Sequence, residues 1–137
     1  FNSVIEKTEQ YTKHTHIVFA LSSFDNLIKN GRMSRITGFL AGKLGFWGIG
    51  IGSEQGTIEI KEKVRGNKKA LNAILKDIKE RATNIETVVI CHCQNAEFAE
   101  SLKNAIQNIS HTVEVKIMPT RGLCSYYAEK GGLIIGF

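Results

Sequence analysis

Residues 87–117 read TVVICHCQNAEFAESLKNAIQNISHTVEVKI, a pattern of strand, helix and strand. The apolar run at 87–91 predicts a buried strand, and Asn95 stands where a helix N-cap is expected. A second strand is predicted at 113–117. Between Asn95 and that strand, apolar residues recur at helical spacing: Phe98, Leu102, Ala105, Ile106 and Ile109. Because two strands joined by a crossover helix pair in parallel, we expect part of the sheet to be parallel.

The rest of the chain extends this unit to an α/β fold, a mixed, partly parallel sheet with flanking helices. Apolar runs predict further strands at 16–21, 57–61 and 132–135. Apolar residues at helical spacing predict helices at 1–12 and from Asn67 to about Arg81.

A short helix is expected after the strand at 16–21. Ser22 is predicted to cap it, with Asp25 as the acidic third residue of a capping-box-like start. Asn30 and Gly31 are expected to end it, because both tolerate the left-handed conformation. Ser34 is then predicted to cap a second short helix that carries Ile36, Phe39, Leu40 and Leu44.

The composition fits one folded domain over residues 1–137, with 42% hydrophobic and 23% charged residues. No apolar stretch approaches the ~20 residues of a membrane span, so no stable membrane insertion is expected. Three cysteines, an odd number, favour reduced thiols and a cytoplasmic location. The chain begins at Phe1, already within a helical pattern, so we expect a fragment or trimmed domain.

Glycine is concentrated at residues 38–56, which hold seven of the 13 glycines, and Gln55-Gly56 is typical of a hairpin turn. Large apolar side chains stand between these glycines. Packing in the core is one interpretation of them. An apolar groove for a lipid is the other, because glycine allows a ligand to approach the backbone closely.

Motifs for nucleotide or metal chemistry are weak. Residues 38–44 lack the spacing of a phosphate-binding loop. Cys91 and Cys93 alternate with His92 along a strand, so the three cannot chelate a metal as a unit. The histidines His14 and His16 complete a zinc site only if their strand neighbours the one at 87–91.

Two basic features stand out against a net charge of +5. Arg32 lies between the end of one predicted helix and the start of another, where a guanidinium and backbone N–H groups converge on an anion. A surface arginine or a helix C-cap explains it equally well. The stretch from Lys61 to Lys69 is either a solvated helix start or a docking surface for an acidic partner. No aromatic interleaving indicates nucleic acid.

Several motifs, in order, resemble those of the DegV family of bacterial fatty-acid-binding proteins. Residues 22–34, SSFDNLIKNGRMS, resemble the family's DTLxxLxxGGRIS stretch. Residues 64–71, VRGNKKAL, resemble its VRGRKKAL, and residues 90–99, ICHCQNAEFA, resemble xxHADNPExA. The glycine-rich C-terminal end of the chain, which finishes with Gly136-Phe137, is also similar to the family's ending. The resemblance therefore covers nearly the whole chain.

The resemblance implies the C-terminal, lipid-covering domain of a two-domain carrier. A long-chain fatty acid is then the ligand, without a further cofactor, metal or catalytic residue. The missing N-terminal DegV-like domain is implied to hold the carboxylate through Ser and Thr hydroxyls. Arg32 and Ser34 are implied in the head-group network, and Arg65 in docking a fatty acid kinase subunit. The expected acyl-chain lining is Ile36, Phe39, Leu40, Leu44, Phe46, Trp47 and Ile49.

The sequence also departs from the family pattern. The histidine that many members place near the C-terminus is absent, and residues 122–127, GLCSYY, occupy that region. Two alternatives therefore stand beside the carrier. One is a small cytosolic enzyme that uses Cys124, or the Cys91-His92 region, with the nearby tyrosines. The other is a regulatory interaction domain that uses the stretch from Lys61 to Lys69.

Overall fold

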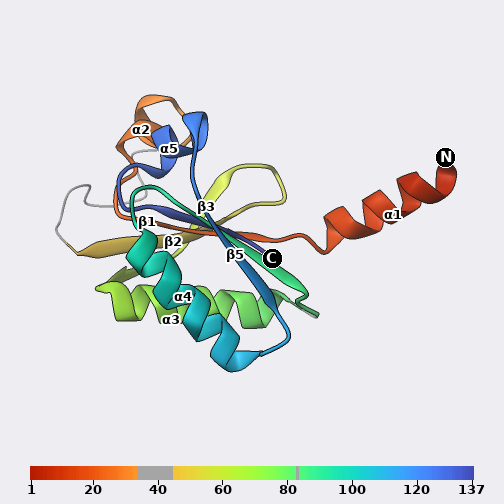
Figure 1. The fold of residues 1–137 in the computed structure, drawn as a ribbon. Coiled ribbons are helices and arrows are strands. Elements are labelled where there is room, and N and C mark those ends of the chain that lie inside the picture. The colour runs from red at the N-terminus through yellow and green to blue at the C-terminus, as the bar shows by residue number, and fades with distance from the viewer. Residues whose placement is uncertain (34–44, 83) are drawn as a thin grey trace.

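The computed structural model describes residues 1–33, 45–82 and 84–137. Within these ranges, six strands form one sheet in the order β3-β2-β1-β6-β4-β5 (Figure 1). The strands are β1 Ile17–Leu21, β2 Phe46–Gly52, β3 Ile58–Arg65, β4 Thr87–His92, β5 Glu114–Pro119 and β6 Leu133–Gly136. The helices are α1 Asn2–Lys13, α2 Asp25–Lys29, α3 Asn67–Arg81, α4 Ala96–Ile109 and α5 Gly122–Ala128.

The strand pairing confirms the predicted mixed sheet. β4 and β5 pair in parallel across the crossover helix α4. β1 pairs antiparallel with both β2 and β6, β2 pairs antiparallel with β3, and β6 pairs antiparallel with β4. The β2–β3 hairpin turns at Gly56, whose φ of +74° requires glycine and whose N–H donates to the Ser53 carbonyl.

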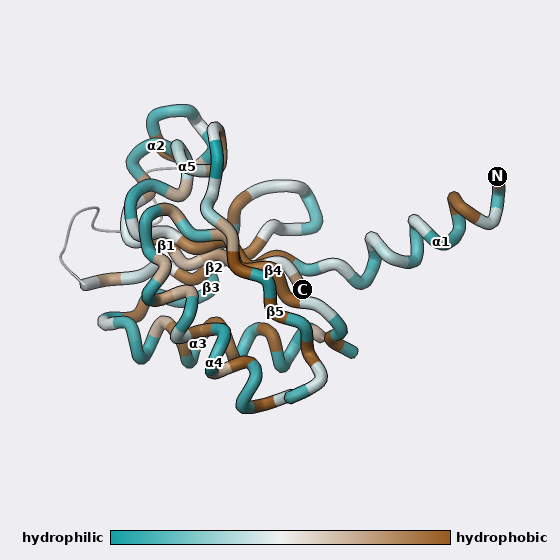
Figure 2. The backbone as a smooth tube through the Cα atoms, viewed as in Figure 1, coloured by the Kyte–Doolittle hydropathy of each residue, from teal (hydrophilic) through white to brown (hydrophobic). Residues whose placement is uncertain are grey.

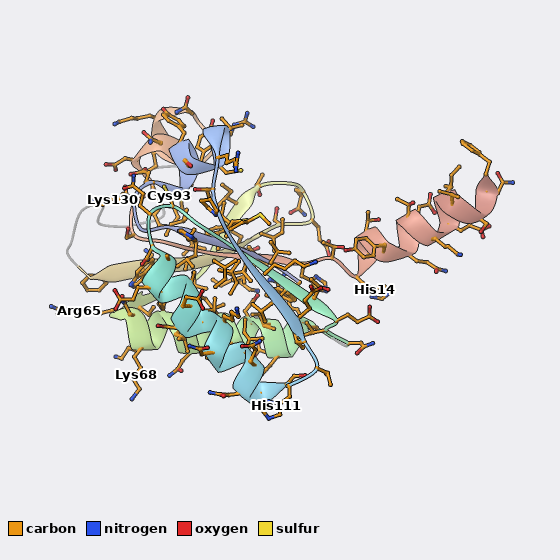
Figure 3. The ribbon with its side chains drawn as sticks, in the orientation of Figure 1. His14, Arg65, Lys68, Cys93, His111 and Lys130 are labelled. Atoms are coloured by element: carbon orange, nitrogen blue, oxygen red, sulfur yellow. The ribbon has the colours of Figure 1, made fainter. Side chains whose placement is uncertain are left out.

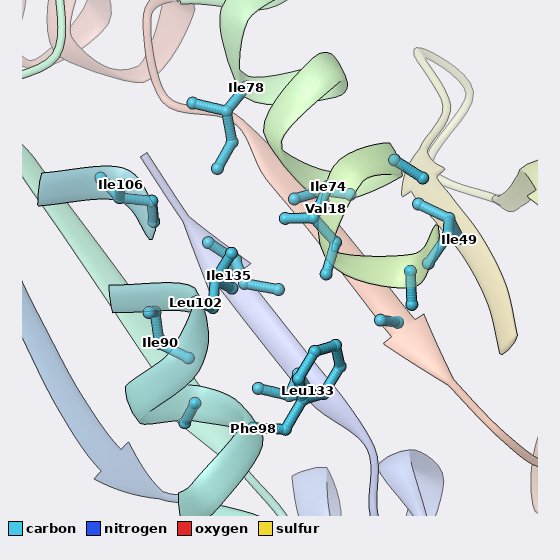
Figure 4. Close-up of a cluster of buried hydrophobic side chains, with 14 of the residues drawn as sticks. Val18, Ile49, Ile74, Ile78, Ile90, Phe98, Leu102, Ile106, Leu133 and Ile135 are labelled. Atoms are coloured by element: carbon cyan, nitrogen blue, oxygen red, sulfur yellow. The ribbon is translucent and has the colours of Figure 1, made fainter. Parts of the chain in front are cut away.

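One face of the sheet is covered by α3 and α4, and the larger core lies there (Figure 4). The apolar side chains that recur at helical spacing on α3 and α4 pack against every second side chain of the strands beneath them. The brown segments of Figure 2 mark this hydrophobic centre of the fold. Fully buried members of this core include Val18, Ile74, Ile90, Leu102, Leu133 and Ile135.

The opposite face carries the two short helices α2 and α5 over one end of the sheet (Figure 1). A second, smaller apolar cluster lies beneath them: Phe19, Leu21, Phe24, Leu27, Met33 and Ala128. α1 extends away from the sheet, and none of its residues is buried. None of the described helices has the length and apolar character needed to cross a membrane.

A β-bulge divides the apolar residues of β3 between the two faces. Ile49 pairs with Glu62 but Gly50 pairs with Ile60, so Lys61 is the extra residue. Val64 therefore packs into the helix-covered core, while Ile60 packs with the cluster on the opposite face. Simple alternation along the strand places both on one face, so the bulge cannot be read from the sequence.

The helix caps differ from the prediction in two places. Ser22 does not cap α2: its hydroxyl donates to the Lys130 carbonyl at 3.5 Å, and Ser23 Oγ accepts from the Asp25 N–H at 3.3 Å. Asn95 occupies the N-cap position of α4, as predicted, but its side-chain amide donates to the Gly131 carbonyl at 2.8 Å. Ser22 and Asn95 thus bond to groups distant in sequence, whereas Ser23 bonds within the turn before α2.

Candidate functional site

The end of α2 fixes the position of Arg32. Gly31 has a φ of +66°, and its N–H donates to the Ile28 carbonyl at 3.1 Å. The Arg32 N–H donates to the Leu27 carbonyl at 2.8 Å, which completes a Schellman motif. Asn30-Gly31 therefore ends the helix as predicted. The motif leaves Arg32 exposed, and the next residue, Met33, is buried in the smaller apolar cluster.

α5, which we did not predict from the sequence, holds α2 in place. The Glu129 carboxylate accepts from the Asn26 backbone N–H at 2.9 Å. The Asn26 side-chain amide donates to the Tyr126 carbonyl at 2.8 Å, and the Asn30 amide donates to the Tyr126 hydroxyl at 3.0 Å. These bonds join residues about a hundred positions apart and orient α2, the helix that precedes Arg32.

A continuous apolar line crosses the sheet on the face opposite α3 and α4. Strand register places one residue of each strand side by side, and we call these six residues the apolar row. Phe19 and Ile134, near its middle, pack into the smaller cluster, whereas Met118 at one end is 44% exposed. In spatial order the apolar row is Ile60, Gly50, Phe19, Ile134, Cys91 and Met118.

The thiols lie around β4 and α5. Cys91 belongs to the apolar row; burial raises the pKa of its thiol, and the nearby Cys124 thiol raises it further. Cys93 packs against the smaller cluster, and its thiol points to the Ser125 carbonyl at 3.9 Å. His92 Nδ1 accepts from the Asn95 N–H at 3.2 Å, so this imidazole supports the start of α4.

The condition for a zinc site is not met. β6 lies between β1 and β4, so His16 and Cys91 do not come from neighbouring strands. Figure 3 shows His14 and Cys93 at different ends of the sheet. Among the described residues, no group of three histidine, cysteine or acidic side chains is arranged to hold a metal.

Arg65 lies at the end of β3, beside the start of α3. Its guanidinium carbon is 5.6 Å from the centre of the Phe46 ring, a cation–π contact between paired residues of β2 and β3. Arg65 and Lys68 are both exposed at the same end of the molecule (Figure 3). The first turn of α3 carries Lys68 and Lys69 and no acidic residue, and we call Arg65 together with this turn the basic end.

The structure separates the residues predicted to line an acyl chain. Trp47 and Ile49 lie in the helix-covered core, where the Trp47 indole donates to Asn67 Oδ1 at 3.2 Å. Strand alternation places Phe46 on the opposite face. Ser34, Ile36, Phe39, Leu40 and Leu44, with the helix predicted there, lie outside the described residues. Their roles, and those of Arg32 and Arg65, stay predictions.

Two contributors were missing from the sequence-based site. The sequence predicted Phe19 only as part of a buried strand. Its place in the apolar row depends on the register of β1 with β2 and β6. Glu129 belongs to no motif, because its contact is with the distant Asn26. The sequence offered one indication of the position of Phe19: alternation along β1 places Phe19 and Leu21 on the same face of the sheet.

Comparison with known proteins gives a consistent result. The family model described as the DegV family matches residues 1–137. A DegV domain-containing protein of Streptococcus pyogenes serotype M3 is 36% identical over 137 residues, which are 100% of this chain and 49% of that protein. The chain thus spans about half the length of the curated relatives it matches.

Solved structures show the same fold. The Streptococcus pneumoniae fatty acid kinase B3 protein loaded with linoleic acid has a TM-score of 0.93 and 35% identity. The match covers 99% of this chain and 48% of that one. A DegV family protein from Eubacterium eligens loaded with heptadecanoic acid has a TM-score of 0.93 and 33% identity, and the match covers 99% and 49%. With a family model matched from its first residue to its last, this chain belongs to the DegV family.

Proposed function

We propose that this chain is one half of a fatty-acid carrier and covers the acyl chain of a bound long-chain fatty acid. The observation that carries the proposal is its similarity, at 35% and 33% identity, to two structures loaded with fatty acids. The chain matches about half of each of those structures, and in this proposal it is likewise about half of a longer protein. The other half, an N-terminal DegV-like domain, completes the site and supplies hydroxyls for the carboxylate.

The apolar row supports a location for the acyl chain. The helix-covered face is filled by α3 and α4, whereas on the opposite face Ile17 and Met118 are 50% and 44% exposed. Large apolar side chains left open on one face of a sheet indicate a surface that a ligand or partner covers. Each acyl methylene buried there contributes about 0.8 kcal/mol to binding.

Arg32 supports a location for the carboxylate. Its guanidinium is exposed at the end of α2, next to Met33 of the smaller apolar cluster, so a charged site adjoins an apolar one. Ser34, two residues on, is the second proposed member of the head-group network. A fatty acid needs both kinds of site, because its carboxylate and its chain have opposite solvation requirements.

The carrier performs no bond chemistry in this proposal. A nucleophilic cysteine requires a thiolate, and burial raises the pKa of Cys91, which favours the protonated thiol. The proposed partner is a fatty acid kinase subunit that receives the carboxylate, and Arg65 at the basic end is its proposed contact. The proposed location is the cytoplasm.

The experiment measures binding of oleic acid and oleyl alcohol to the full-length protein and to its Arg32→Gln variant. Loss of a charge-assisted hydrogen bond should weaken oleic acid binding about tenfold and leave the alcohol unchanged. Lys29→Gln, which removes an exposed charge from the last turn of α2, is the matched control and should change neither. Equal loss for acid and alcohol contradicts the head-group role. Failure of the parent protein to bind either contradicts the carrier.

A further inference from the structure

The first turn of α5 is fixed against the end of β4. The Thr120 N–H donates to the His92 carbonyl at 2.9 Å, and the Thr120 and Ser125 hydroxyls are bonded at 2.9 Å. The Cys93 thiol donates to the Ser125 carbonyl at 3.9 Å. Cys124, the residue before Ser125 on α5, is therefore held close to the last residues of β4.

Cys91 lies beneath this turn. It pairs with Ile134, which packs into the smaller apolar cluster, as Cys93 does, so the Cys91 and Cys93 side chains lie on the face that α5 covers. The Cys91 and Cys124 thiols are near enough to interact electrostatically. Because the Cys93 thiol already bonds the Ser125 carbonyl, Cys91 is the better placed partner for Cys124.

We propose that Cys91 and Cys124 form a reversible disulfide on oxidation by a peroxide, and that this bond weakens fatty-acid binding. The effect on binding rests on the proposed function. Cys91 belongs to the apolar row, where the acyl chain is proposed to lie. A disulfide fastens α5 over that position and displaces the part of the chain that covers it.

Hydrogen peroxide supplies the oxidising equivalents. The Cys124 thiolate attacks one peroxide oxygen, the O–O bond breaks, and the products are a Cys124 sulfenic acid and hydroxide, which takes up the proton that the thiol released. The Cys91 sulfur then attacks the Cys124 sulfur, the S–O bond breaks, and the sulfenic oxygen leaves as water with the Cys91 proton. Cys124 meets the peroxide first because it is exposed, whereas burial raises the pKa of Cys91.

The first experiment treats the full-length protein with hydrogen peroxide and maps joined tryptic peptides by mass spectrometry. Cys91 and Cys93 share peptide 82–103, and Cys124 lies in peptide 122–130. The two peptides should be joined in the parent and in Cys93→Ser, but not in Cys91→Ser or Cys124→Ser, and dithiothreitol should separate them. Joining that persists in Cys91→Ser, or no joining in Cys93→Ser, overturns the disulfide.

The second experiment compares the dissociation constants of oleic acid for the reduced and the oxidised protein. Oxidation should weaken binding to Cys93→Ser about tenfold, because about two methylenes, each worth about fourfold in affinity, lose their burial. Cys124→Ser is the matched control: it meets the same peroxide, also at the exposed Met118, but cannot form the bond, so its affinity should not change.

The outcomes separate the disulfide from the carrier. A disulfide that forms without a change in affinity for oleic acid overturns the proposed effect on binding and leaves the carrier intact. An equal loss of affinity in Cys124→Ser assigns the effect to other oxidation and overturns it too. Reduced parent protein that does not bind oleic acid overturns the proposed function itself.

Discussion

The Glu129 carboxylate bonds the Asn26 backbone N–H at 2.9 Å across 103 positions of sequence. This single contact links the end of α5 to the start of α2, and Arg32 follows the end of α2 at Lys29. Glu129 makes it from a backbone conformation of φ 54° and ψ 175°, which glycine tolerates far better than other residues. The bond and the backbone strain therefore act in opposite directions on stability.

Substitution of Glu129 should separate these two effects. Glu129→Ala loses the bond but keeps the strain, and we expect it to lower the free energy of unfolding by about 1–2 kcal/mol. Glu129→Gly loses the bond and relieves the strain, so it should be more stable than the alanine variant by about 1 kcal/mol. Urea unfolding of the full-length protein measures both. Equal stability of the two variants contradicts the strained conformation.

The Cys91 thiol should react slowly and respond to ligand. Because burial raises its pKa, the thiolate is scarce at neutral pH, and modification by a maleimide should be slower than for a free cysteine peptide. The rate should rise with pH beyond the point where the peptide's rate levels off. The raised pKa also stabilises the fold below the unfolded thiol's pKa, and this contribution is lost as pH rises through the folded value.

A bound fatty acid should protect the same thiol. Cys91 belongs to the apolar row, so an acyl chain lying there covers it, and oleic acid should slow its modification several-fold. Cys124, exposed on α5, is the internal comparison within one mass-spectrometric digest. Equal rates at Cys91 with and without saturating oleic acid contradict a path along the apolar row.

Trp47 tests which face of β2 meets the ligand. It is the chain's only tryptophan, is 6% exposed, and packs against Phe98 with ring centres 5.1 Å apart. Fluorine NMR of fluorotryptophan-labelled full-length protein, with Trp47 assigned by Trp47→Phe, should show this resonance unmoved by oleic acid. A large shift would instead support the lining role predicted for Trp47 and Ile49.

Arg65 should affect the partner and not the lipid. Arg65→Glu reverses an exposed charge at the basic end, where charge complementarity governs association. Binding to a fatty acid kinase subunit should weaken at least tenfold in surface plasmon resonance, while oleic acid affinity stays within about twofold. Lys13→Glu, on exposed α1, is the charge-matched control. Equal effects of both variants would show nonspecific attraction.

Patterns within short segments predicted most of the fold. The helix at α3 and the β4–α4–β5 unit follow from periodicity, and the end of α2 follows from the conformational freedom of Asn30 and Gly31. Contacts between distant segments could not be predicted in this way. Ser22 bonds Lys130 rather than its own helix, and the bulge at Gly50 sends Val64 and Ile60 to opposite faces.

In the candidate site, too, features set by local sequence could be predicted and contacts between distant segments could not. The position of Arg32 just after a helix end could be predicted because its surroundings are local, a helix end and a left-handed glycine, and its role in the site stays a prediction. The apolar row was not found, because each strand contributes one residue and only register joins them. Trp47 looked equivalent to Phe46 in the sequence, yet one position along a strand reverses the face on which a side chain lies.

The central claim, that this chain covers a bound fatty acid, is tested most directly by organic extraction and mass spectrometry of the full-length protein purified from bacteria under native conditions. The account predicts a long-chain fatty acid in about equimolar amount with the protein. Protein that yields no fatty acid, and that fails to bind added oleic or palmitic acid, would contradict it.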